Sequence, residues 1–273
     1  MQAVEYKDTL LSTHGLSLSL GGNRILQDVS VEIRDVVRPG CITGQVVGLL
    51  GPSGMGKTQL FRMLAGLQVP DTGEVRIGAE QRPVRPGSVG VVAQHYPLFE
   101  HRTVLGNLRV AGARAKLSAD EAQQKARGLL ERFGLWAKAD AYPAQLSGGQ
   151  RQRVAIAQQF MCSDHFLLMD EPFSGLDPLA VESVCELIRE VAAQDELNTL
   201  ILVTHDVGAA IEVSDTLWLL GRDRGADGRP LAGARIQATY DLVERGLAWR
   251  RGISSTPEFL QLQSEIRERF RSL

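Results

Sequence analysis

The sequence lacks the features that mark membrane-spanning, secreted and zinc-binding proteins. No apolar run reaches the roughly 18 residues needed to cross a bilayer, and the polar N-terminus Met1–Asp8 does not resemble a signal peptide. The three cysteines, Cys41, Cys162 and Cys185, form no CxxC pair and lie near no histidine at metal-ligand spacing. We therefore expect a soluble protein in a reducing cytosolic setting.

An excess of charge of one sign is also lacking. The 30 Lys and Arg residues are balanced by 32 Asp and Glu residues, which leaves a formal net charge of −2. Such a balance provides no general attraction to nucleic acid or to anionic lipid, so we expect no nucleic-acid partner. The length of 273 residues favours one large α/β domain with an inserted subdomain over several independent domains.

Two kinds of strand pattern are present. Leucine alternates with serine over Leu16–Leu20, and Val29–Ile33 alternates in the same way, which predicts two half-buried antiparallel strands. Gly21, Gly22 and Asn23 lie near their connection and tolerate positive φ. Four later runs are apolar without alternation, which indicates burial on both faces: Val46–Leu50, Val89–Val92, Phe166–Met169 and Leu200–Val203. Helical stretches separate these runs, as expected of a parallel sheet that is covered on both sides.

The middle and the end of the chain have other patterns. From about Pro97 to Gln145 there is no strand pattern, and Ser118-x-x-Glu121 is a capping box ahead of apolar residues at helical spacing. The segment Gly221–Pro230 predicts a surface loop, and Pro257–Phe270 predicts a helix. We therefore divide the chain into a core with an N-terminal antiparallel β subdomain, a helical subdomain and a short C-terminal extension, which comprise residues 1–96 with 146–221, 97–145 and 222–273.

The segment GPSGMGKT directly follows the first buried run and matches GxxxxGK[ST] in its strand-to-helix context. Its glycines allow successive backbone N–H groups to point inward, and the helix that begins near Lys57 adds a positive field at its N-terminus. We predict that Lys57 reaches the β- and γ-phosphates of ATP and that the Thr58 hydroxyl binds Mg²⁺. The predicted phosphate-binding residues are Gly51, Pro52, Ser53, Gly54, Met55, Gly56, Lys57 and Thr58.

Two adjacent carboxylates end the buried run Phe166–Met169. Strand ends at this edge of a parallel sheet face the ligand crevice. We predict that Asp170 binds Mg²⁺, directly or through water, and that Glu171 polarises the water that attacks the γ-phosphate of ATP.

A second phosphate-binding pattern is LSGGQ, which ends at Gln150 and opens a predicted helix over Arg151–Gln159. With these motifs together, the chain resembles the nucleotide-binding subunits of ATP-binding cassette (ABC) transporters over about Leu11 to Leu220. The resemblance implies a P-loop NTPase (RecA-like) α/β fold. It also implies a head-to-tail dimer, a homodimer or a pair with another ABC subunit, with two ATP molecules at its interface. In that dimer the ATP held by one copy would be covered by four residues of the other, Ser147, Gly148, Gly149 and Gln150.

Further residues match the family singly. Gln94 matches the glutamine that contacts Mg²⁺ or the lytic water and senses the transmembrane partner, and Ser174–Asp177 matches the D-loop. His205 follows the run Leu200–Val203 and the single residue Thr204, and it matches the histidine that contacts the γ-phosphate. The implied catalytic set is Glu171, His205, Lys57 and Gln94, and the implied metal ligands are Thr58, Gln94 and Asp170.

Three features depart from the family pattern. Leu20 stands where the family usually has an aromatic ring that stacks on adenine. The segment Asp35–Thr43 is longer than the usual link, and it either supplies a substitute contact to the base or is a surface loop. Gln158 and Gln159 replace a pair that usually includes an arginine.

The resemblance implies a peripheral ATPase on the inner face of the cell membrane, bound to integral membrane permease subunits and acting indirectly with a solute-binding protein. The residues that follow Gln94 resemble those of importers for polar amino acids or for anions such as nitrate and sulfonates. We therefore predict ATP hydrolysis that drives transport, with import of a small polar solute favoured. The alternatives are an efflux or lipid-export ATPase and a non-transport ABC ATPase.

Overall fold

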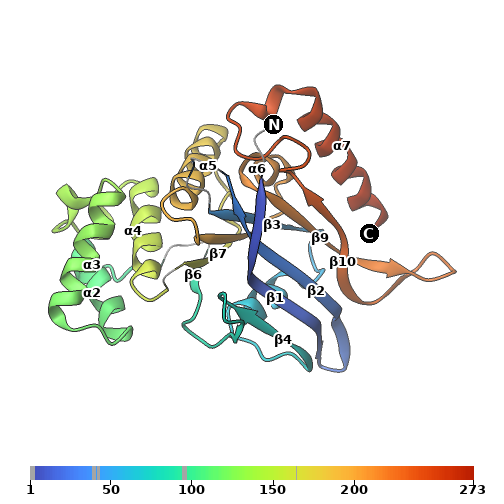
Figure 1. Ribbon diagram of the computed structural model, residues 1–273, viewed down its shortest axis with the longest axis horizontal. Coiled ribbons are helices and arrows are strands. Elements are labelled where there is room, and N and C mark those ends of the chain that lie inside the picture. Colours follow the sequence, from blue (N-terminus) through green and yellow to red (C-terminus); the bar gives the residue numbers. More distant parts are fainter. Residues whose placement is uncertain (1–3, 39–40, 42–43, 94–96, 164) are drawn as a thin grey trace.

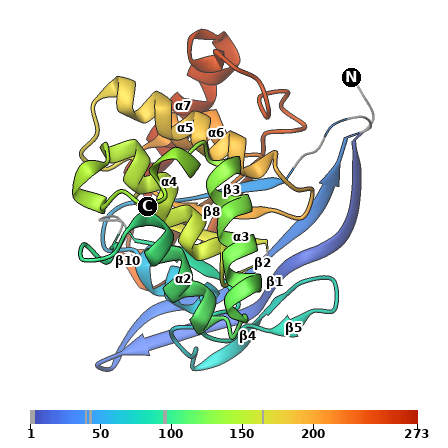
Figure 2. The same cartoon turned by 90° about the vertical axis from the view of Figure 1, so that its left-hand side faces the viewer.

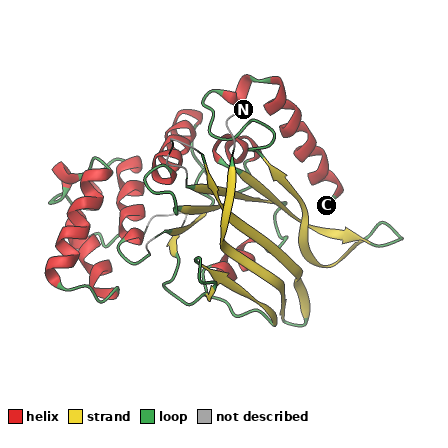
Figure 3. Ribbon diagram, viewed as in Figure 1, coloured by secondary structure: helices red, strands yellow, loops and turns green. Residues whose placement is uncertain are grey.

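The computed structural model describes residues 4–38, 41, 44–93, 97–163 and 165–273. Its strands form one ten-stranded sheet in the order β5-β4-β1-β2-β10-β9-β3-β8-β7-β6 (Figure 3). The parallel part consists of β3 (Gln45–Leu50), β6 (Gly90–Val92), β7 (Phe166–Asp170), β8 (Thr199–Val203) and β9 (Thr216–Arg224). Every residue of β3 and β8 is buried, so the prediction of parallel strands covered on both faces is confirmed.

The antiparallel part is larger than the sequence pattern predicts. Its elements are β1 (Glu5–Leu20), β2 (Asn23–Val37), β4 (Thr72–Ile77), β5 (Arg82–Pro83) and β10 (Pro230–Asp241). The predicted pair of alternating strands corresponds to β1 and β2, which pair over most of their length. Gly21 and Gly22, at φ of 57° and 80°, form the turn between them, because glycine adopts positive φ without a steric cost.

Helices cover the sheet and extend from one side of it. They are α1 (Lys57–Leu64), α2 (Val104–Arg114), α3 (Ala119–Arg132), α4 (Gly148–Phe160), α5 (Pro178–Ala192), α6 (Val207–Val213) and α7 (Pro257–Ser272), with short 3₁₀ turns at Trp136–Lys138, Pro143–Gln145 and Ile253–Ser255. In Figures 1 and 2, α2, α3 and α4 lie together beside the sheet. None of the helices in the described part of the chain has the length and apolar character of a membrane span.

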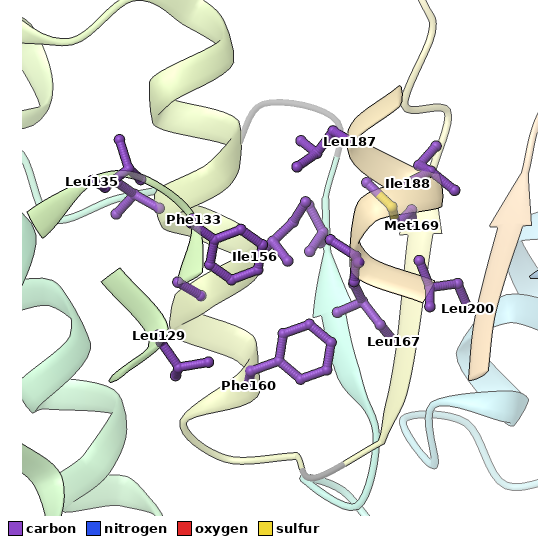
Figure 4. Packing of buried hydrophobic residues seen from close by; sticks show 14 of the residues in the cluster. Leu129, Phe133, Leu135, Ile156, Phe160, Leu167, Met169, Leu187, Ile188 and Leu200 are labelled. Carbon is purple, nitrogen blue, oxygen red and sulfur yellow. The ribbon is translucent and has the colours of Figure 1, made fainter. Parts of the chain in front are cut away.

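Helix α4 connects the outer helices with the sheet. Its residues Ile156 and Phe160 lie between the α3 side, with Leu129, and the β7 side, with Leu167 (Figure 4). Helix α3 begins as predicted, since Ser118 and Glu121 form both hydrogen bonds of a capping box. The start of α4 lies earlier than predicted, at Gly148 rather than Arg151, because Ser147 is itself the N-cap residue.

The prediction of a surface loop over Gly221–Pro230 is wrong for half of that segment. Strand β9 continues to Arg224, β10 begins at Pro230, and the two pair as an antiparallel hairpin. The Gly, Arg and Asp residues there mark a hairpin turn, and their composition alone did not separate a turn from a longer loop. The predicted C-terminal helix is confirmed as α7, which packs against α6.

In the unusual segment Asp35–Thr43, the described residues are 35–38 and 41, and Arg38 and Cys41 line a pocket with Gly44 and Val46 at the amino end of β3. Asp35 is still part of β2, and its carboxylate accepts a hydrogen bond of 3.1 Å from Gln45 Nε2. The guanidinium of Arg38 lies 4.5 Å from the ring centre of Trp249, near the C-terminus. The phosphate-loop sequence follows the opposite end of β3, roughly 16 Å away. The described residues of this segment therefore lie at the opposite end of β3 from the phosphate-loop sequence.

Candidate active site

The loop Gly51–Thr58 connects the carboxyl end of β3 to α1. Gly54 and Gly56 have φ of 79° and 91°, so side chains there would strain the backbone. A Cβ at Gly56 would also lie 2.9 Å from Ile25 Cγ2. The loop is therefore held against β2 while its backbone turns into the N-terminus of α1, a geometry that favours an anion.

Lys57 is buried within this loop. Its Nζ donates hydrogen bonds to the carbonyl oxygens of Gly51 at 2.7 Å and of Pro52 at 3.2 Å. Burial lowers the pKa of Lys57, and the negative charges of Glu171 and Asp170 oppose that shift. The ammonium group thus lies within the electrostatic influence of both predicted carboxylates, which come from a distant part of the chain.

Glu171 and His205 are joined directly. Strands β7 and β8 are neighbours in the sheet, and His205 Nδ1 lies 2.9 Å from Glu171 Oε2. The Glu171 N–H donates to the Val203 carbonyl, and its φ of 48° is unusual for a residue with a side chain. Such strain is maintained only where surrounding contacts impose it, and it is frequent at active sites.

The hydroxyl of Thr204 also lies beside Glu171 and His205, although the sequence did not predict it as part of the site. Thr204 is fully buried, and its Oγ1 donates to Glu171 Oε2 at 3.3 Å. Its position between the β8 pattern and His205 was the available signal, but only the fold shows that its hydroxyl faces the carboxylate.

The Asp170 carboxylate and the Thr58 hydroxyl are oxygen ligands that fit a Mg²⁺ ion, if the ion also binds the phosphates of a nucleotide. Burial, followed by the charge of Glu171, raises the pKa of Asp170, and Lys57 lowers it. Thr58 is exposed at the start of α1, so its hydroxyl is accessible. No group of three or more His, Cys, Asp or Glu side chains in the described ranges could hold a metal by itself. One carboxylate and one hydroxyl are a typical protein contribution to Mg²⁺ bound with a nucleotide.

The residues Ser147–Gln150, predicted to contact phosphate, lie at the start of α4. Ser147 Oγ accepts from Gln150 N, and the Gln150 side chain accepts from Ser147 N. Ser147, Gly148 and Gly149 border a groove of about 710 Å³ between α4 and α5 that Leu176 and Ala180 also line. Among described residues, no hydrogen bond or ion pair joins them to Lys57 or Glu171. One copy of the chain therefore has the two phosphate-binding patterns as distinct sites.

The next two predicted residues are Gln94 and, in the predicted D-loop, Asp177. Gln94 lies outside the described residues. Asp177, the last residue of the predicted D-loop, is the N-cap of α5 and accepts from Ala180 N. Its neighbour Leu176 is exposed at the groove beside Ser147.

Leu20 lies at the end of β1 and is 41% exposed. It pairs with Asn23 across the hairpin, so it shares a face with Asn23 and Ile25. Because Ile25 abuts Gly56, this exposed aliphatic side chain lies on the face of the hairpin that meets the phosphate loop.

The structure also explains Gln159. Its side-chain oxygen accepts a hydrogen bond of 3.1 Å from Val91 N, on the strand β6 that ends the sheet. The glutamine thus satisfies an edge N–H group, which an arginine has no acceptor to do.

Comparisons with known proteins identify the family of the chain. A family model described as ABC transporter matches residues 37–174. The chain belongs to this family. It is 42% identical over 222 residues to the sulfate/thiosulfate import ATP-binding protein of Cucumis sativus, with 78% of this chain and 61% of that protein covered. It is also 36% identical over 233 residues to the arginine transport ATP-binding protein ArtM of Bacillus subtilis, with 81% and 92% covered.

A solved structure agrees in fold. The chain matches cbiO1 from Clostridium perfringens, part of the ABC transporter complex cbiONQ, with a TM-score of 0.72 at 23% identity, over 96% of this chain and 100% of that one. The predicted fold, a P-loop NTPase with an antiparallel part and inserted helices, is confirmed. The chain spans about 60% of the length of several curated relatives. As a member of this family it is an ATP-binding protein.

Proposed function

We propose that the chain hydrolyses ATP and that Glu171 is the general base. The observation that supports this most directly is the position of Glu171. Its carboxylate contacts His205, and its negative charge acts on the pKa of Lys57. Lys57 would release the loop carbonyls and stabilise negative charge on the transferred phosphoryl group. Glu171 would accept a proton from the attacking water, and His205 would contact the γ-phosphate.

The proposed site uses Mg²⁺ held by Thr58 and Asp170, and by Gln94 as the family pattern implies. When bound, the ion would neutralise charge on the β- and γ-phosphates. Phosphate release from ATP by the purified protein tests the activity. We expect release with Mg²⁺, none after chelation, and recovery on adding Mg²⁺ back. Equal release with and without chelator would contradict the magnesium assignment.

The two distinct anion sites support a proposed head-to-tail dimer. Ser147–Gln150 of one copy would cover the nucleotide bound at Gly51–Thr58 of another. The N-terminus of α4 offers hydrogen-bond donors, and within one chain these donors do not contact the loop Gly51–Thr58. The dimer would form with ATP and separate after hydrolysis. A sedimentation measurement with and without ATP, using Glu171→Gln to slow turnover, tests this assignment. A mass that does not depend on ATP would contradict it.

We further propose that the hydrolysis powers import of a small polar solute, through membrane permease subunits and indirectly a solute-binding protein. The first relative above is named as an ATP-binding protein for sulfate/thiosulfate import and the second for arginine transport, and these solutes are polar. The chain would then act at the inner face of the membrane, with residues 97–145 as the helical subdomain. Reconstitution with its membrane permease subunits tests the direction of transport, and ATP-driven efflux would favour the export alternative. ATPase activity stimulated by RNA or DNA would favour a non-transport role.

A further inference from the structure

Thr204 occupies a fixed position between the sheet and the helix that follows His205. It is 0% exposed, and its N–H donates to the Leu49 carbonyl of β3. Two residues later, Asp206 caps α6. The backbone on both sides of Thr204 is therefore constrained by regular structure.

The neighbours of the Thr204 hydroxyl determine to which atom it donates its proton. Oγ1 accepts a hydrogen bond of 3.1 Å from Asp206 N. A hydroxyl has one proton to donate, and a carboxylate can only accept. The proton of Thr204 is therefore available to Glu171 Oε2, which lies at 3.3 Å.

Thr204 and His205 both contact the same oxygen of Glu171. His205 Nδ1 lies 2.9 Å from Oε2, the atom that Thr204 also contacts. Within the described ranges, no protein donor contacts Oε1. Oε2 is thus held by two side chains, whereas Oε1 is free of donors from the described residues and can accept the proton of a water molecule there.

The two donors differ in their freedom to move. The side chain of His205 is 62% exposed, whereas Thr204 is completely buried. In the proposed function His205 contacts the γ-phosphate, so the position of its exposed ring would depend on the nucleotide. Thr204 cannot turn away without disturbing β8 and the start of α6.

We propose that Thr204 is a positioning residue that keeps the Glu171 carboxylate oriented, with Oε1 toward the attacking water, when His205 contacts the nucleotide. This inference rests on the proposed function of Glu171. In this proposal the buried Thr204 hydroxyl holds Glu171 at all times, whereas the exposed His205 contacts the nucleotide only when it is bound.

Steady-state phosphate release by four proteins tests this role: wild type, Thr204→Val, Thr204→Ser and Thr199→Val. Valine keeps the branched shape but removes the hydroxyl, whereas serine keeps the hydroxyl. Thr199 is the matched control, since it is also 0% exposed on β8 and its hydroxyl donates to the Leu197 carbonyl at the other end of the strand.

We expect Thr204→Val to lower kcat on the order of tenfold, as for loss of a hydrogen bond to a charged group, with KM for ATP changed less than about twofold. Thr204→Ser should keep most of the activity, and Thr199→Val should leave kcat unchanged. Wild-type kcat in Thr204→Val would overturn the inference. Equal losses in the valine and serine variants would also overturn it, because they would indicate a packing role.

A second measurement separates positioning from general damage to the fold. In a Glu171→Gln background, Thr204→Val should cause no further loss of the residual turnover, because the carboxylate that it orients is gone. A further loss of about tenfold in that background would overturn the inference. Absence of any ATP hydrolysis by the wild type would instead overturn the proposed function itself.

Discussion

The two edges of the parallel strands both have buried or half-buried acids, but those acids have different surroundings. At the carboxyl edge, Asp170 and Glu171 lie near Lys57 and an exposed histidine, and their charges act to raise the pKa of Lys57 in the loop predicted to bind phosphates. At the amino edge, Asp215 is buried, and its Oδ2 accepts a hydrogen bond of 2.7 Å from Val46 N. The first edge is arranged for a ligand, whereas the second uses its polar groups to join β3 to its neighbours.

The largest expected effect tests the carboxyl edge. Glu171→Gln should lower ATP turnover by about a hundredfold or more, because it removes the general base, while ATP binding remains. Phosphate release and nucleotide titration measure the two properties. Glu196→Gln, at an exposed site near the amino edge, is the matched control and should behave as wild type. Near-normal turnover of Glu171→Gln would remove Glu171 from its proposed role.

The next prediction concerns the amino edge. Burial raises the pKa of Asp215 to about 8, although the hydrogen bond from Val46 acts in the opposite direction. Because the pKa is higher in the folded state than in the unfolded state, the folded protein binds more protons between about pH 4 and pH 8. Its stability should therefore fall as pH rises through that window.

Asp215→Asn removes this titration and keeps an acceptor for Val46. Thermal unfolding from pH 5 to pH 8 should give a smaller decrease in Tm for the variant than for wild type, and ATPase activity at fixed pH should be nearly unchanged. Parallel Tm curves for the two proteins would show that Asp215 does not control this pH dependence.

A smaller effect is expected at Leu20. Replacing it with tyrosine should tighten ATP binding by roughly tenfold, because an aromatic ring can stack on the base. Titration with ATP and GTP measures affinity and selectivity. Leu231→Tyr, at a similarly exposed site, controls for general effects of an added tyrosine. Unchanged affinity in Leu20→Tyr would show that the base binds elsewhere.

The smallest expected effect is at Arg38, whose guanidinium lies over Trp249. Arg38→Ala should lower the free energy of unfolding by about 0.5–1 kcal/mol, as for an accessible cation–π pair. Denaturant unfolding measures this change, and ATP turnover should stay at the wild-type level. A clear loss of turnover would mean that the amino edge also influences catalysis.

Much of the fold followed from local patterns. The buried runs predicted the parallel strands, and the capping box predicted α3, because both depend on residues close in sequence. The long hairpin of β9 and β10 was not predicted, since its turn residues look the same as those of a longer surface loop. Its role in the sheet depends on pairing with distant residues, such as Ala234 with Leu26.

The sequence alone determined the phosphate loop, the adjacent carboxylates Asp170 and Glu171 and the fold class, because each depends on residue types at fixed spacing. Only the tertiary structure decided that Thr204 and His205 share one oxygen of Glu171, and that Arg38 lies over Trp249 near the amino end of β3. These contacts join residues up to 211 positions apart, such as Arg38 and Trp249. Pairing of strands and packing of helices bring them together, and no local pattern specifies that.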